Sequence, residues 1–76
     1  MFYNVITQKE EQVKNTLKIK RWKAGLKQYE LAFLLGCSTT YLSQVENNQV
    51  EPNEEFQRKA AEIFGVRVDE IFPPKP

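Results

Sequence analysis

Uncharged hydrogen-bonding side chains are concentrated in one short segment, and they are Thr39, Thr40, Ser43 and Gln44. On a helix over residues 39–45 this spacing places all of them on one face, away from Leu42 and Val45. Hydroxyl and amide groups on such a face can form hydrogen bonds with base edges in a DNA major groove. These residues alone leave a second interpretation open, which is a helix surface that only meets solvent.

The residue types in this chain give little support for catalysis or for metal binding. The chain has no histidine, so it lacks the commonest general base and the commonest metal ligand. A single cysteine, Cys37, allows neither an internal disulfide nor a cysteine-based zinc site. We interpret Cys37 as a small core side chain, with a redox sensor as the alternative. We expect no enzyme, no cofactor, no metal and no small-molecule ligand.

The net charge of +1 conceals an uneven distribution. Residues 1–26 contain six basic and two acidic side chains, a net charge of +4. Residues 27–50 carry a net −1 and residues 51–76 a net −2, while residues 39–45 carry no charge at all. The near-neutral total therefore does not exclude a nucleic-acid partner. It predicts modest nonspecific affinity, with specificity resting on neutral side chains.

Length and composition indicate one small soluble domain. The chain has 76 residues, 41% of them hydrophobic and 28% charged, which are ordinary globular values. Its longest apolar run, residues 31–35, is far too short for a membrane span. The first residues lack the features of a signal peptide. We expect a cytoplasmic location, no membrane contact, and a thin core that pairing with a second copy would support.

Glycine and proline divide the chain into short helical pieces. The pattern predicts helices over residues 9–24, 28–35, 39–45 and 54–64, and a short fifth helix or turn over residues 68–72. We therefore expect an all-α fold, a five-helix orthogonal bundle. The predicted organisation is an N-terminal arm over residues 1–8, a domain over residues 9–72 and a proline-rich end over residues 73–76.

The second and third predicted helices are joined by a turn with distinctive chemistry. Ala32 is small enough to let the third helix cross the second closely, and Gly36 accepts the positive φ of a sharp turn. Ser38 is a favourable N-cap for the third helix. Leu42 and Val45 would then seat that helix on the core.

This arrangement resembles the phage-repressor and Cro-like helix-turn-helix family, the XRE-type small transcriptional regulators. The resemblance extends from about Leu17 to Phe72. Its matching residues are Arg21, Gly25, Leu26, Gln28, Leu31, Ala32, Gly36, Ser38, Leu42, Glu46, Pro52, Phe64, Gly65, Val66, Asp69, Glu70, Ile71 and Phe72. It implies a lambda-repressor-like DNA-binding fold whose third helix enters the major groove.

The resemblance also implies roles for single residues. The implied DNA-binding residues are Lys27, Gln28, Ser38, Thr39, Thr40, Ser43, Gln44 and Asn48. Gln28 would contact a phosphate and support the recognition helix, while Arg21 and Glu46 would form a structural ion pair. Lys27 stands where a serine or threonine usually caps the second helix, and its ammonium would contact a phosphate instead.

Several apolar and aromatic side chains have no role in that pattern. Trp22, Phe33 and Leu34 stand where polar residues are common, which suggests an interface. Trp22 would pack against the N-terminal segment or a partner. Tyr41 would either contact DNA or pack against the helix over residues 54–64, and the sequence does not decide between these two.

The combined interpretation is a sequence-specific DNA-binding transcriptional regulator. Its partner would be double-stranded DNA, bound by a homodimer at a palindromic operator. By resemblance, the dimer surface would lie around Val68, Ile71 and Phe72, which would otherwise close the core. The alternative function is a protein-interaction module on the same fold, such as an antitoxin or a bridging factor.

Overall fold

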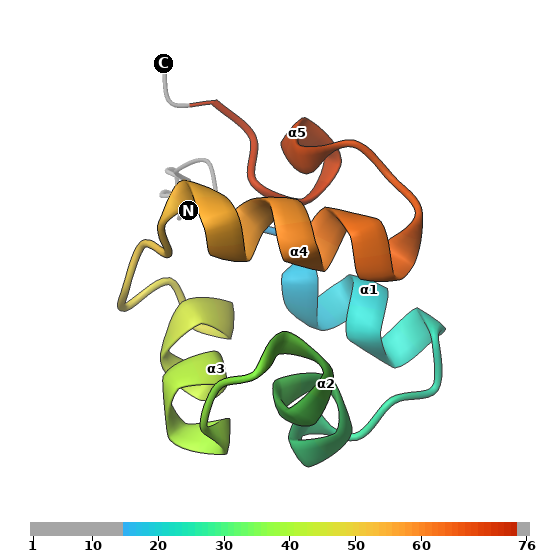
Figure 1. The fold of residues 1–76 in the computed structure, drawn as a ribbon, viewed down its shortest axis with the longest axis vertical. Helices are drawn as coiled ribbons and strands as arrows, with labels where there is room; N and C mark the ends of the chain where they lie inside the picture. The colour runs from blue at the N-terminus through green and yellow to red at the C-terminus, as the bar shows by residue number, and fades with distance from the viewer. Residues whose placement is uncertain (1–14, 75–76) are drawn as a thin grey trace, which may run out of the picture.

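The computed structural model describes residues 15–74, which form five helices and no strand (Figure 1). The helices are α1 (Leu17–Lys23), α2 (Gln28–Leu35), α3 (Thr39–Glu46), α4 (Glu54–Phe64) and α5 (Val68–Ile71). Tight connections join them, and α2 and α3 lie beside each other on one side of α4. The predicted all-α class is confirmed. No helix of the described part is long and apolar enough to cross a membrane.

Four of the five helices lie where the sequence predicted them. The bounds of α2 and α4 agree with the prediction, α3 is longer by Glu46, and α5 ends one residue earlier, at Ile71. Left-handed glycines at positions 36 and 65 end α2 and α4. Asn53 caps α4 by accepting a hydrogen bond from the backbone N–H of Phe56 at 2.9 Å.

The predicted start of the first helix is wrong within the described residues. The prediction ran from residue 9, but Asn15 and Thr16 are not helical and α1 begins at Leu17. Asn15 Oδ1 accepts a hydrogen bond from Leu17 N–H at 3.0 Å, and such a local side-chain bond favours a helix start. Residues 9–14 and the predicted arm over residues 1–8 lie outside the described residues.

Thr16 connects the start of α1 to the end of α5. Its backbone N–H donates to the carbonyl of Ile71 at 2.9 Å, and its hydroxyl donates to the carbonyl of Glu70 at 2.8 Å. These two bonds supply partners for carbonyls in the last turn of α5, which the short helix itself cannot satisfy. The first and last helices are therefore held together by the backbone as well as by side-chain packing.

Every helix contributes to one hydrophobic core. Leu17, Leu31, Leu42, Val45 and Ile71 are fully buried. Ala60 and Ala61 add the side of α4 that faces them. Since Ile71 is inaccessible, the prediction that it contributes to a dimer surface is wrong, and the alternative that it closes the core holds.

The turn between α2 and α3 is built as the sequence predicted. Gly36 has φ +75°, and the backbone N–H of Cys37 donates to the carbonyl of Ala32 at 3.0 Å. Cys37 packs partly buried against the core. Burial raises the pKa of its thiol, an effect that the charge of nearby Lys59 partly offsets. Its packing against the core agrees with the interpretation of Cys37 as a core side chain.

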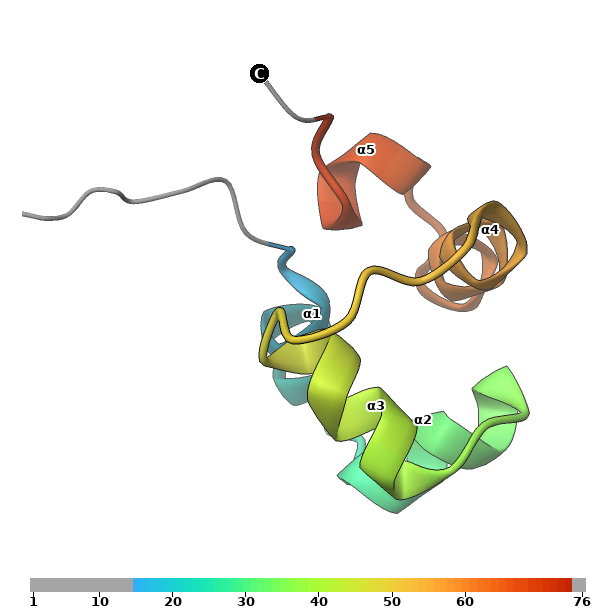
Figure 2. The same ribbon diagram turned by 90° about the vertical axis from the view of Figure 1, so that its left-hand side faces the viewer.

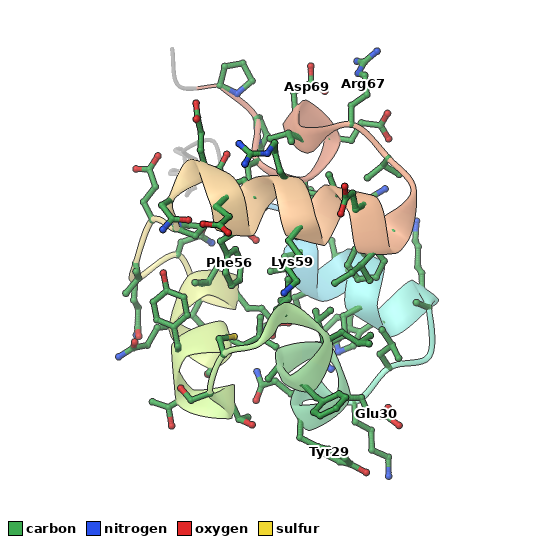
Figure 3. All side chains as sticks on the ribbon, viewed as in Figure 1. Tyr29, Glu30, Phe56, Lys59, Arg67 and Asp69 are labelled. Atoms are coloured by element: carbon green, nitrogen blue, oxygen red, sulfur yellow. The ribbon has the colours of Figure 1, made fainter. Side chains whose placement is uncertain are left out.

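Lys59 of α4 reaches across to this turn (Figure 3). Its Nζ would lie 3.7 Å from a Cβ atom placed on Gly36. A cation at the C-terminal end of a helix is favoured by the helix dipole. Lys59 therefore connects α4 to the end of α2 through charge, in addition to the apolar contacts of the core.

Candidate nucleic-acid interface

Helix α3 lies at the left-hand side of the fold in Figure 1 and faces the viewer in Figure 2. One of its faces is buried in the core. Leu42 and Val45 on the inner face are fully buried, whereas Thr39 and Thr40 at the N-terminal end are exposed. Ser43 and Gln44 are partly exposed. The structure thus brings the four predicted base-contacting residues onto one accessible helix, whose opposite face is anchored in the core.

The N-terminus of α3 is capped as predicted. Ser38 has an extended backbone, and its hydroxyl oxygen accepts a hydrogen bond from the backbone N–H of Tyr41 at 3.0 Å. The Ser38 side chain is exposed, so it can be reached from outside the protein. Its cap role is confirmed, and its contact with DNA stays a prediction.

The C-terminus of α3 is fixed by a buried ion pair. Arg21 Nε lies 2.7 Å from one oxygen of Glu46, and its NH2 group lies 3.2 Å from the other. The Glu46 side chain is fully buried and that of Arg21 is 10% exposed. Arg21 also donates to the carbonyl of Leu26 at 3.1 Å. This pair confirms the structural role that the resemblance implied, since it ties α1 to the end of α3.

Gln28 joins the same network from the start of α2. Its amide Nε2 donates to Glu46 Oε1 at 3.0 Å. The support that it was predicted to give the recognition helix is therefore present. Because Gln28 remains partly exposed, a phosphate contact by the same residue stays a prediction.

Lys27 occupies the N-cap position of α2 without capping it. A lysine side chain carries no hydrogen-bond acceptor, so it cannot bond to the free N–H groups of the first turn. Glu30 compensates by accepting a hydrogen bond from the backbone N–H of Lys27 at 2.7 Å. The ammonium of Lys27 is exposed beside the start of α2, where its proposed phosphate contact would be made.

Asn48 follows α3 in the left-handed conformation, with φ +62°. Its Oδ1 accepts hydrogen bonds from Asn15, from the backbone N–H at 3.2 Å and from Nδ2 at 3.1 Å. Asn15 Nδ2 also donates to the carbonyl of Val45 at 2.8 Å. Since Oδ1 of Asn48 is occupied within the protein, its predicted DNA contact would rest on the side-chain nitrogen.

Tyr41 packs against α4, which is one of the two alternatives that the sequence left open; its side chain stays partly exposed, and a DNA contact stays a prediction. Its ring meets that of Phe56 edge-on, with centroids 5.7 Å apart. Phe56 meets Phe72 in the same way, with centroids 6.5 Å apart. This row of rings joins α3 to α4 and to the residue after α5.

Sequence reasoning missed a polar contact on the side of α3. Lys18 Nζ lies 3.2 Å from Asn47 Oδ1, and Asn47 Nδ2 lies 3.4 Å from Ser43 Oγ. The same ammonium lies 5.8 Å from the centroid of the Trp22 ring. The spacing of Ser43 and Asn47, four residues apart at the end of a helix, was a usable signal. Nothing in the sequence pointed from Lys18 to Asn47.

The large exposed apolar side chains of the described part all belong to α1 and α2. They are Ile19, Trp22, Tyr29, Phe33 and Leu34. Phe33 is the most exposed, at 84%. Tyr29, Phe33 and Leu34 line a shallow hollow of about 400 Å³ together with Leu26 and Glu30. Tyr29 and Glu30 lie on the side of α2 that faces away from α4 (Figure 3).

Comparison with known proteins places these features in a family. Residues 17–71 match the family model described as Helix-turn-helix. The chain belongs to this helix-turn-helix family. A similar protein from Methanocaldococcus jannaschii is 35% identical over 60 residues, which cover 79% of this chain and 91% of the relative. That relative is named as an uncharacterised HTH-type transcriptional regulator. In helix-turn-helix terms, α2 and α3 are the paired helices, and α3 occupies the place of the second helix of the motif.

Proposed function

We propose that this helix-turn-helix protein is a sequence-specific DNA-binding transcriptional regulator. The observation that carries the proposal is the build of α3, whose apolar residues Leu42 and Val45 are buried while Thr39 and Thr40 face outward. A helix anchored in this way can present short polar side chains to base edges. The family match and the relative named as a transcriptional regulator support the same function.

The proposed contacts divide into two groups. Thr39, Thr40, Ser43 and Gln44 would meet base edges and so determine specificity. The start of α2, with Lys27 and Gln28, would meet the phosphate backbone and fix the register. Ser38 and Asn48, at the two ends of α3, would also contact the DNA.

We propose further that the protein binds a palindromic operator as a homodimer. Two recognition helices would then enter successive major grooves about 34–36 Å apart. With Ile71 buried, the remaining candidates at the C-terminal end are Val68 and Phe72, which are partly exposed. Sedimentation of the full chain at micromolar concentration, alone and with operator DNA, tests this point. A strict monomer in both conditions contradicts it.

DNA binding is tested by salt dependence together with two substitutions. Random duplexes selected by the full chain supply the binding sequence, and affinity is then measured across a salt series. We expect affinity to fall steeply with salt, because bound lysines release counterions from the phosphates. Thr39→Ala and Gln44→Ala should each lose about 1–3 kcal/mol of binding free energy if each removes a base contact.

Two controls accompany that measurement. Circular dichroism establishes that each variant keeps its helices, and a scrambled duplex gives the nonspecific affinity. Both variants should lose affinity for the selected sequence and keep their affinity for the scrambled one. Affinity that does not respond to salt, or variants that bind the selected sequence as the parent does, would contradict the proposed function.

The second candidate function is protein interaction on the same fold. The observation that favours it is the hollow on α2 that the exposed side chains of Tyr29, Phe33 and Leu34 line together, since contiguous apolar surface marks contact sites. Phe33→Glu places a charge at the most exposed of these positions. If DNA regulation is the function, we expect this variant to keep operator affinity within about twofold, because surface changes away from contacts have small effects. Leu31→Met is a conservative core control. If Phe33→Glu loses affinity for the operator and Leu31→Met keeps it, this result would favour the interaction role.

A further inference from the structure

Three residues form a chain of polar contacts that ends on the recognition helix. Lys18 of α1 donates to Asn47 Oδ1 at 3.2 Å, and Asn47 Nδ2 donates to Ser43 Oγ at 3.4 Å. The Lys18 ammonium also lies 5.8 Å from the centroid of the Trp22 ring, close enough for an attraction between the cation and the ring face. Lys18 is thus held from two sides, by Trp22 and by Asn47.

Lys18 determines which way the Asn47 amide is turned. An ammonium group has only donors, so the Asn47 atom that faces it must be the carbonyl oxygen. The amino group of Asn47 therefore faces Ser43. An amino group can only donate, so the Ser43 oxygen must be the acceptor in this contact. The positive charge on the carbonyl side also polarises the amide and strengthens its N–H as a donor.

A serine hydroxyl that accepts a hydrogen bond keeps its own proton for another partner. Ser43 is partly exposed on the same helix as Thr39, Thr40 and Gln44, which the proposed function assigns to base recognition. Its O–H is thus directed away from Asn47 and can be offered to the DNA. In the major groove, N7 and O6 of guanine, N7 of adenine and O4 of thymine accept hydrogen bonds. The amino group of cytosine donates one instead.

We propose that Ser43 acts as a hydrogen-bond donor to one base of the operator, and that Lys18 and Asn47 set this polarity. The inference rests on the proposed DNA-binding function and adds the type of base edge that one position selects. Ser43 makes the contact, while Asn47 is a positioning residue and Lys18 orients Asn47. At the position that Ser43 contacts, the operator should have a base that accepts a hydrogen bond in the major groove. Cytosine should be disfavoured there.

The decisive variant is Asn47→Asp, which reverses the polarity. A carboxylate only accepts, so the Ser43 proton would turn inward to it, and the serine lone pairs would face the DNA. Lys18 would still hold the side chain through an ion pair. Ser43 would then favour the amino groups of cytosine or adenine. One hydrogen bond contributes about 0.5–1.5 kcal/mol, so we expect the base preference at this position to change by roughly twofold to tenfold.

The experiment is selection from random duplexes by the full chain and its variants. Ser43→Ala first identifies the operator position, because the preference there should become flat while the other positions stay unchanged. Asn47→Asp should then change the preferred base at that position from one that accepts a hydrogen bond to one that donates it. Gln49→Glu is the matched control, since it adds the same charge at an exposed residue of the same loop and should leave the preference unchanged.

Each outcome either supports or contradicts the inference. If the parent selects a defined sequence but Ser43→Ala alters no position, or only lowers affinity uniformly, Ser43 contacts no base and the inference is wrong while the proposed function stands. The inference is also wrong if Asn47→Asp and Gln49→Glu change the preference equally. If the parent enriches no sequence at all, the proposed function fails and the inference fails with it.

Discussion

Glu46→Ala is expected to lower the free energy of unfolding by about 3–5 kcal/mol. The Glu46 side chain is fully buried and receives hydrogen bonds from Arg21 at 2.7 Å and 3.2 Å and from Gln28 at 3.0 Å. Removing the carboxylate leaves the nearly buried guanidinium of Arg21 without its counter-charge. A buried charge that has lost its partner is far more costly than a missing surface contact.

Urea unfolding followed by circular dichroism measures this loss, and two variants control it. Asp69→Ala breaks the Arg67–Asp69 pair, whose side chains are 77% and 53% exposed, and should cost no more than about 1 kcal/mol. Glu46→Gln keeps the shape of the side chain and removes the charge, so it should fall between the two. If Glu46→Ala costs as little as Asp69→Ala, the ion pair does not hold the end of α3 in place.

Leu42→Ala is expected to cost about 2–5 kcal/mol. Leu42 is fully buried on the inner face of the recognition helix, where it belongs to the cluster that includes Leu31 and Ile71. Truncation removes apolar surface and leaves a cavity that the neighbours fill only in part. Because the cavity lies beneath the predicted DNA-contacting face, operator affinity should fall as well, even though Leu42 itself meets no DNA.

The same unfolding measurement applies, with Leu34→Ala as the matched control. Leu34 is also a leucine on a helix, but it is 44% exposed, so its truncation should cost less than half as much. Operator affinity of Leu34→Ala should remain close to that of the parent. Equal losses from both leucines would contradict the assignment of Leu42 to the core that supports the recognition helix.

The elements whose ends depend on local chemistry were predictable from the sequence. Gly36 ends α2 because it adopts a positive φ, and Ser38 starts α3 because its hydroxyl caps Tyr41 N–H. The buried positions Leu31 and Leu42 followed from helical spacing. The Arg21–Glu46 pair came from the family resemblance, since neither spacing nor composition brings these two residues together.

Features that depend on contacts between distant residues were not predictable in this way. Asn15, which precedes α1, donates hydrogen bonds to Val45 and Asn48, residues that sequence alone does not place nearby. The Lys18–Asn47 contact is of the same kind. The DNA contacts of Gln28, Thr39 and the other site residues stay predictions, because they depend on a partner molecule.

The bonds from Thr16 to Glu70 and Ile71 have a consequence for how the protein is made. They join residues 54 and 55 positions apart, nearly the two ends of the described chain. During synthesis, α1, α2 and α3 leave the ribosome before Ile71, whose side chain and carbonyl complete the core and the start of α1. Contacts of such long sequence separation form late, because the chain must first close a large loop. A nascent chain that stops short of α5 would therefore contain every proposed DNA-contacting residue but lack the last contacts that hold them in place.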